Sequence, residues 1–124
     1  MAEPSTADKT VEHFDVLVVG AGMSGVNAAY HLTHQCPGTS FVVLETHETF
    51  GGTWWSHTYP GIRSDSDLYT FGFRFKPWVG PPIATADEIR TYMGEVIDEN
   101  DLADHIRYRH CIQTAAWSSA DSRW

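Results

Sequence analysis

The sequence predicts an α/β fold with a parallel β-sheet, and three features near its start indicate this. The apolar run Val16–Val19 leads into a glycine-rich turn, and a segment of helical character follows. A second apolar run, Phe41–Leu44, is closed by an acidic residue. Apolar runs of this length, bounded by turn signals, are typical of buried strands. We therefore expect strands over 15–19 and 40–45 with a helix over 23–34 between them, which is a βαβ unit.

The turn between the first strand and the helix, Gly20-Ala-Gly-Met-Ser-Gly, has the spacing GxGxxG. In a βαβ unit, Gly20 permits the tight turn and Gly22 lets the backbone approach a pyrophosphate. Gly25 lets the helix pack close to the sheet, while free N–H groups at the helix N-terminus hold the anion. With a strand before it and a helix after it, the motif matches the dinucleotide-binding fingerprint of Rossmann-like folds. The alternative is a glycine turn in an ordinary βαβ unit.

The acidic residue after the second apolar run is Glu45, twenty positions beyond Gly25. A carboxylate at the tip of the second strand accepts hydrogen bonds from both ribose hydroxyls of an adenosine, and it repels a 2′-phosphate. This site therefore suits FAD or NAD and argues against NADP.

The next segment distinguishes FAD from NAD. Gly51-Gly52 allows a loop to pass very close to a ligand, and Thr53 and Trp54 add a hydroxyl and a flat ring. Tyr59-Pro-Gly is a rigid turn, because proline fixes φ and glycine accepts a positive φ. Nicotinamide binding alone does not need such a loop. It fits a longer cofactor whose isoalloxazine ring runs past it.

Together these motifs resemble the N-terminal part of class B flavoprotein monooxygenases, of the Baeyer–Villiger type. Within that family, the run from Arg63 to Phe75 is most similar to the mycobacterial group that activates the prodrug ethionamide. The resemblance extends from about Phe14 to Trp124. It rests on four motifs, which are Gly20-Ala-Gly-Met-Ser-Gly, Leu44-Glu, Gly51-Gly-Thr-Trp and Tyr59-Pro-Gly-Ile-Arg-Ser-Asp-Ser-Asp.

The resemblance implies a Rossmann-like FAD-binding domain of the two-dinucleotide-binding flavoprotein kind, apparently truncated. In the family, a second GxGxxG motif for NADPH, a signature of Phe, Gly, His and Trp, and a catalytic arginine lie further along the chain. None of these is in the present sequence. We expect residues 1–12 to form a flexible N-terminal tail and residues 13–124 to form a partial FAD-binding domain.

The resemblance also implies an activity and its cofactors. NADPH reduces FAD, and O2 then oxygenates a small-molecule ketone or a sulfur-containing substrate. The protein positions the flavin, excludes water and tunes the local charge. Two other functions remain open at this point. One is the nucleotide domain of an NAD-dependent dehydrogenase, and the other is a non-catalytic remnant that binds a nucleotide or nothing.

The family's functional residues correspond to particular positions here. Asp65 lies where a family carboxylate approaches the flavin and orients the distant arginine, so it is the one candidate for catalysis. Family members commonly carry arginine at the position of Thr58, so a positive charge near the cofactor is missing. The implied FAD-binding residues are Gly20, Gly22, Ser24, Gly25, Glu45, Gly52, Thr53, Trp54, Trp55, Ser56, Asp65 and Ile112, and those near NADPH are Arg63, Ser64 and Asp65.

Three of these assignments have simpler alternatives. The two tryptophans Trp54 and Trp55 could simply pack a loop. Asp65 could cap a turn, because aspartate readily forms Asx-turns. Arg63 could be a surface charge only.

The second half of the chain contains one clear helix signal. We expect an irregular, ligand-facing segment from 46 to about 84, ended by a helix with a capping box of Thr85 and Glu88. Its apolar positions recur at helical spacing, which predicts one buried stripe. We expect short strands over Ile106–Arg109 and Cys111–Trp117, then a hairpin turn. The stripe is formed by Ile89, Tyr92, Met93, Val96 and Ile97.

Composition excludes some functions. A net charge of −8 over 124 residues argues against nucleic-acid binding. No apolar run approaches the roughly 18 residues that a membrane span needs. With no apolar signal-peptide core near the start, we expect a cytoplasmic location and leave peripheral membrane association open. The spacing of Cys36 and Cys111 indicates reduced structural thiols. His31 and His34 lack further converging ligands, so we expect no metal site.

Overall fold

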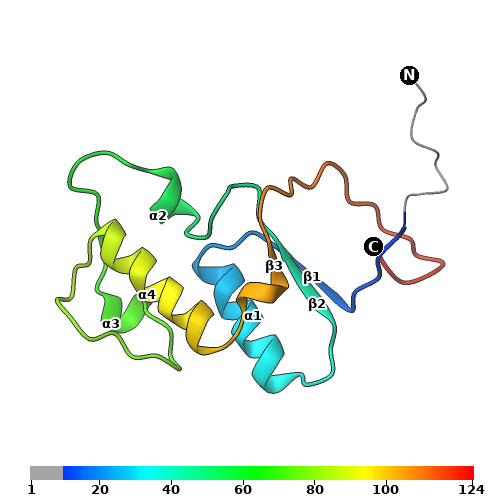
Figure 1. Cartoon of the computed structure of the whole chain (residues 1–124), viewed down its shortest axis with the longest axis horizontal. Coiled ribbons are helices and arrows are strands. Elements are labelled where there is room, and N and C mark those ends of the chain that lie inside the picture. Colours follow the sequence, from blue (N-terminus) through cyan, green and yellow to red (C-terminus); the bar gives the residue numbers. More distant parts are fainter. Residues whose placement is uncertain (1–9) are drawn as a thin grey trace.

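The computed structural model describes residues 10–124 and shows a small parallel sheet beside two long helices (Figure 1). The strands lie in the order β1-β2-β3, and both neighbouring pairs are parallel. The sequence therefore predicted the opening βαβ unit correctly, to within one residue at each boundary. The elements are β1 (Val16–Val19), α1 (Met23–Gln35), β2 (Phe41–Leu44), α2 (Thr53–Ser56), α3 (Leu68–Phe71), α4 (Ala86–Glu99), the 3-10 helix η2 (Ala103–His105) and β3 (Ile106–Arg107).

The hydrophobic core lies between one face of the sheet and the helices α1 and α4. Val43 of β2 and Ile106 of β3 are register partners and are both buried in it. Val26 of α1 packs into the same core, and α4 contacts α1. In β1, by contrast, Leu17 and Val19 are 51% and 72% exposed. The residues of β1 therefore alternate between the covered core face and an open face of the sheet.

Helix α4 begins and packs as its sequence predicts. The Thr85 side chain accepts a hydrogen bond from the Glu88 backbone N–H, and the Glu88 side chain accepts one from the Thr85 backbone N–H. Such a cap stabilises a helix by about 1 kcal/mol. The whole expected apolar stripe is buried, namely Ile89, Tyr92, Met93, Val96 and Ile97.

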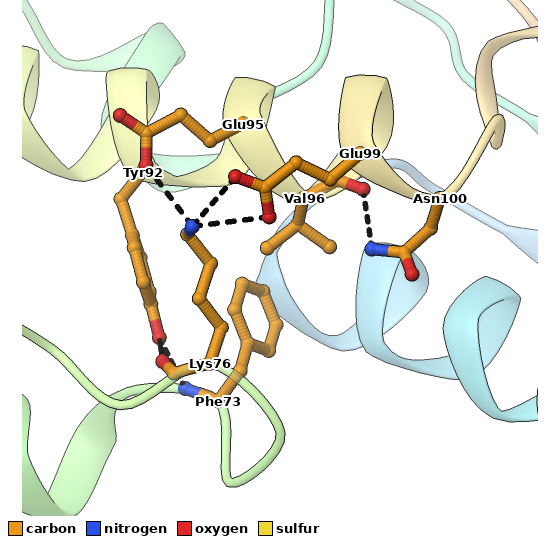
Figure 2. A network of polar contacts seen from close by, with 7 residues as sticks. All are labelled: Phe73, Lys76, Tyr92, Glu95, Val96, Glu99 and Asn100. Carbon is orange, nitrogen blue, oxygen red and sulfur yellow. Dashed lines mark hydrogen bonds and ion pairs between the residues drawn. The ribbon is translucent and has the colours of Figure 1, made fainter.

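A polar network fastens the segment after α3 to α4 (Figure 2). The Tyr92 hydroxyl accepts a hydrogen bond from the Phe73 backbone N–H at 2.9 Å and donates one to the Lys76 carbonyl. The Lys76 ammonium meets the Glu99 carboxylate at 3.0 and 3.1 Å and the Glu95 carboxylate at 3.3 Å. Burial raises the pKa of Tyr92, with an opposing contribution from the Phe73 hydrogen bond. The pKa of Lys76 is raised, chiefly by its hydrogen bond to the Glu99 carboxylate.

The segment from 46 to 84 is not wholly irregular, which corrects the sequence-based expectation. It contains α2 and α3, each four residues long. The start of α3 is fixed by Asp67, whose carboxylate accepts a hydrogen bond from the Thr70 N–H at 3.0 Å. Helices of one turn are too short to show a hydrophobic period, so the pattern could not reveal them.

The expectation of a strand over Cys111–Trp117 is wrong, and the strand expected over Ile106–Arg109 stops at Arg107. Arg109 takes a positive φ of 58°, which interrupts the extended backbone, while its N–H still bonds to the His47 carbonyl at 2.9 Å. Within the described part of the chain, residues 111–117 pair with no neighbouring strand. The expected turn does form, since Ser118 and Arg123 make an antiparallel bridge.

Several smaller expectations concern the chain ends and surface. Residues 1–9 of the expected tail lie outside the described residues, while Glu12 meets the Arg107 guanidinium at 2.5 and 3.0 Å. Both Cys36 and Cys111 are free and exposed. Across residues 10–124, no helix is long and apolar enough to cross a membrane. The same residues contain no cluster of three or more potential His, Cys, Asp or Glu ligands.

Candidate functional site

A pocket of about 430 Å³ opens where β1 ends and α1 begins. Ligands of open α/β sheets bind at this position, outside the carboxyl ends of the strands. Seven of the implied FAD-binding residues line it, together with Val19, Met23, Gly51 and Phe71. The seven are Gly20, Gly22, Ser24, Gly25, Gly52, Thr53 and Trp54.

Two close backbone approaches shape this pocket. A Cβ atom at Gly25 would lie 1.8 Å from the Gly20 carbonyl oxygen, so only glycine lets α1 start against the turn. A Cβ atom at Gly52 would lie 3.0 Å from the Gly22 Cα. The loop containing Gly52 therefore lies directly against the glycine turn, although the two are thirty residues apart.

The N-terminus of α1 is left open for an anion. Its N-cap residue is Gly22, which offers no side-chain cap, and the first turn contains no acidic residue. The first N–H groups of a helix have no partner inside the helix, and the helix dipole adds partial positive charge there. This end of α1 borders the pocket, so its electrostatics favour a phosphate group.

Glu45 lies beneath the glycine turn and is only 5% exposed. Its Oε1 accepts a hydrogen bond from the Ala21 N–H at 2.9 Å, and its Oε2 accepts one from the His47 N–H at 2.8 Å. Each carboxylate oxygen has a second lone pair, so the group can still accept further bonds. Nearby, burial and then the Glu45 charge raise the pKa of Tyr108. Glu45 thus holds the turn in shape, a role that the sequence motif did not indicate.

The Gly51–Trp54 segment closes the other side of the pocket. The Gly51 N–H donates to the Ala21 carbonyl at 2.9 Å, which ties this segment to the glycine turn. The Trp54 ring meets the Phe71 ring edge to face, with centroids 6.4 Å apart. Phe71 was not expected at the site. Its place depends on α3, which no sequence period indicates, so no signal could have found it.

Trp55 and Ser56 are not among the residues that line the pocket, and both make contacts elsewhere. The Arg90 guanidinium lies over the Trp55 ring, with Cζ 5.6 Å from the ring centroid. The Ser56 hydroxyl lies 3.5 Å from the His47 Nε2 atom. Neither side chain lines the glycine pocket, so their contact with a cofactor stays a prediction.

Residues 63–65 form a separate feature next to the start of α4. Arg63 and Thr85 make an antiparallel bridge, and the Arg63 Nε donates to the Gly61 carbonyl at 3.2 Å. Ser64 is buried, and its hydroxyl accepts a hydrogen bond from the Ala84 N–H at 3.1 Å. Asp65 is exposed.

Two further positions from the sequence argument lie outside the glycine pocket. Ile112 lies in the irregular segment after β3 and is partly exposed. Thr58 lines a second hollow, of about 360 Å³, together with Tyr59 and Arg90. An arginine from α4 therefore borders the position where the family commonly has one.

The fold and this pocket define a nucleotide-binding α/β domain. A family model described as an NAD(P)-binding Rossmann-like domain matches residues 18–79, and the chain belongs to this family. The match includes the glycine turn, Glu45 and the Gly51–Trp54 segment.

More specific similarity connects the chain to flavin-dependent oxygenases. It is 51% identical over 114 residues to the FAD-containing monooxygenase EthA of Mycolicibacterium smegmatis. This match covers 91% of the chain and 23% of the relative, so the chain spans about a quarter of the length of that protein. The resemblance to FAD-containing monooxygenases that the motifs indicated is confirmed.

Solved structures of Baeyer–Villiger monooxygenases share the fold. The structure of OTEMO in complex with FAD and NADP superposes with a TM-score of 0.77 at 26% identity, covering 90% of this chain and 22% of that one. A closed structure of cyclohexanone monooxygenase superposes with a TM-score of 0.72 at 31% identity, and the match covers 81% of this chain and 20% of that one. The expected Rossmann-like fold class is likewise confirmed.

Proposed function

We propose that this chain is the FAD-binding portion of an NADPH- and O2-dependent flavin monooxygenase. The observation that carries the proposal is the glycine pocket itself. It has an uncapped helix N-terminus, a glycine turn held from below by the buried Glu45 carboxylate, which does not itself line the pocket, and a second glycine loop that adds an aromatic wall. A plain nicotinamide site needs the first two features but not the third.

The residues of the pocket fit FAD in a definite way. The N–H groups at the start of α1, with Gly22 and Ser24, would hold the pyrophosphate. The free lone pairs of Glu45 would accept hydrogen bonds from the adenosine ribose. Thr53 and Trp54 would face the cofactor further along. Bound FAD would supply the redox chemistry with NADPH and O2, and these residues would bind it and exclude water.

The remaining assignments rest on the family resemblance. We propose that Asp65 approaches the flavin, that Arg63 and Ser64 lie toward NADPH, and that the Ile112 backbone meets the adenine. The exposure of Arg63 and Asp65 leaves both available to a ligand. We also propose that Trp55 and Ser56 contact FAD, and the ground for this is that they lie in the same segment as Trp54.

For the whole protein we propose oxygenation of a small ketone or a sulfur-containing compound. The names of the relatives and of the structural neighbours support this class of reaction. We also propose a cytoplasmic location. The two exposed, unpaired cysteines support it, since such thiols persist in a reducing compartment.

The test separates FAD from NAD and from no ligand. The chain is purified, incubated with FAD and desalted, and its visible absorbance is recorded. We expect a yellow protein with about one FAD per chain. A colourless protein that binds NADH in calorimetry would instead support the dehydrogenase alternative, and a protein that binds neither would contradict the proposal.

A further inference from the structure

Helix α2 follows the Gly51-Gly52 turn of the proposed FAD site, and it is too short to be stable without contacts to other elements. It has four residues, and isolated helices need about 12–15 residues to be even marginally stable. Contacts must therefore hold it, and the long helix that it contacts is α4. Figure 1 shows α2 lying beside the first turns of α4.

Arg90 makes a distinctive contact between these two helices. It is only partly exposed, with its side chain 32% accessible, and its guanidinium lies over the Trp55 ring at 5.6 Å. Its Nε atom is shielded from solvent and has no hydrogen-bond partner within the described residues. A shielded N–H without an acceptor costs free energy, and a cation over an aromatic face offsets part of that cost. Asp87, a neighbour on α4, pairs with the other end of the guanidinium.

The contact is transmitted to the glycine pocket through two tight steps. A Cβ atom at Gly51 would lie 2.9 Å from the Trp55 Cβ and 3.6 Å from the Arg90 Cδ, so Trp55 and Arg90 both pack closely against Gly51. Gly51 in turn donates to the Ala21 carbonyl of the glycine turn at 2.9 Å. A displacement of Trp55 would therefore be passed on to the wall of the pocket.

We infer that Arg90 is a positioning residue for the proposed FAD site. It acts through Trp55 and Gly51 to hold the Gly51–Ser56 segment against the glycine turn, without touching the cofactor. The inference rests on the proposed function for its effect on FAD, while its effect on the loop stands by itself.

The experiment compares Arg90→Met, which keeps an unbranched apolar stem and removes the charge, with Arg90→Lys, which keeps the charge. Arg123→Met, in the C-terminal turn, is the matched control. Amide hydrogen exchange is followed for peptides 50–57 and 41–45 without FAD, and FAD affinity is measured by flavin fluorescence. We expect Arg90→Met to speed exchange in 50–57 only and to weaken FAD binding about 5- to 30-fold, as loss of a shielded cation–π contact implies. Arg90→Lys should restore most of both, and Arg123→Met should change neither.

A double variant tests the route through Trp55. Adding Arg90→Met to Trp55→Leu should produce little further loss, because residues that act through one contact are not additive. Unchanged exchange in Arg90→Met, or an Arg90→Lys variant no better than Arg90→Met, would overturn the inference. If the parent chain binds no FAD while Arg90→Met still loosens 50–57, the proposed function fails and the positioning role stands.

Discussion

At the residue scale, Glu45 has one role that the structure shows, which is holding the glycine turn, and one that we propose, which is binding the adenosine ribose. The motif indicated a ligand for ribose, whereas the structure shows both carboxylate oxygens bonded to backbone N–H groups of the turn and of the following loop. A residue that shapes the turn and also meets the ligand should affect both stability and affinity when it is replaced.

We expect Glu45→Ala to weaken FAD binding by about 1.5–3 kcal/mol, the usual value of a hydrogen bond to a charged group. It should also lower the free energy of unfolding without FAD, because two backbone N–H groups lose their acceptor. Fluorescence titration gives the affinity and urea denaturation gives the stability. Glu48→Ala is the control, because Glu48 is exposed and its one ion pair among residues 10–124 is with Arg109 at 3.3 Å. Unchanged FAD affinity in Glu45→Ala would rule out the ribose assignment.

Sequence reasoning at this scale was strongest for glycines and weakest for aromatic contacts. Gly25 and Gly52 lie where another part of the backbone comes too close for a side chain. Because only glycine tolerates such approaches, these positions can be recognised in the sequence. Phe71 and Arg90 could not be found in this way. Their positions depend on how α3 and α4 pack, which a local pattern does not specify.

At the scale of elements, α4 is the platform on which the ligand-facing loop rests. Its capping box and apolar stripe were predictable because both are local patterns with a helical period. The one-turn helices α2 and α3 were not, since they have no period to detect. The strand expected over Cys111–Trp117 failed for a different reason: β propensity alone does not form a strand without a partner for its backbone.

The Tyr92 hydroxyl should make a measurable contribution to the free energy of unfolding, because it joins α4 to the segment after α3. We expect Tyr92→Phe to lower the free energy of unfolding by about 1–2 kcal/mol, because the buried Phe73 N–H loses its acceptor. Chemical denaturation followed by circular dichroism measures this. Tyr69→Phe is the matched control, since that hydroxyl is in an exposed hydrogen bond to Gly80. Equal stabilities for Tyr92→Phe and the parent chain would contradict the assigned network.

The same network predicts a loss of stability at alkaline pH. Burial raises the pKa of Tyr92, and Glu99 raises that of Lys76. A group whose pKa is raised in the folded state contributes to the stability of the fold. The contribution is complete at pH values below the pKa of the unfolded state, which is about 10 for both groups. It disappears as the pH rises through the pKa of the folded state. The urea midpoint should therefore fall above about pH 10, more steeply in the parent than in Tyr92→Phe. A midpoint equally steep in both would show that Tyr92 does not take part.

At the scale of the whole molecule, β1 presents an open apolar face. Leu17 and Val19 are more than half exposed, and β1 has one hydrogen-bonded neighbour among the described strands. Unpaired strand edges with apolar side chains favour association between chains. We expect the average mass in sedimentation to rise with concentration, and Leu17→Thr to reduce that rise. A strictly monomeric chain at high concentration would contradict this expectation.

We expect these 124 residues by themselves not to turn over. The second glycine motif and the catalytic arginine that the resemblance implies are not in this sequence, so the binding site for the hydride donor is incomplete. NADPH consumption is followed with a ketone or a thioether, using protein free of any longer homologue. Product formation above the free-flavin background would contradict this expectation.

The most direct measurement is a FAD titration of the chain and of its Gly22→Val variant, followed by flavin fluorescence. Removing the open space at Gly22 should block the pyrophosphate while leaving β1 and the core intact. A Cβ atom at Gly22 would lie 3.6 Å from the Gly52 Cα, an ordinary van der Waals contact, and circular dichroism checks that the variant with its further methyl groups remains folded. We expect stoichiometric FAD binding in the parent and none in folded Gly22→Val. Equal FAD binding by both proteins would contradict the claim that the glycine pocket holds the cofactor.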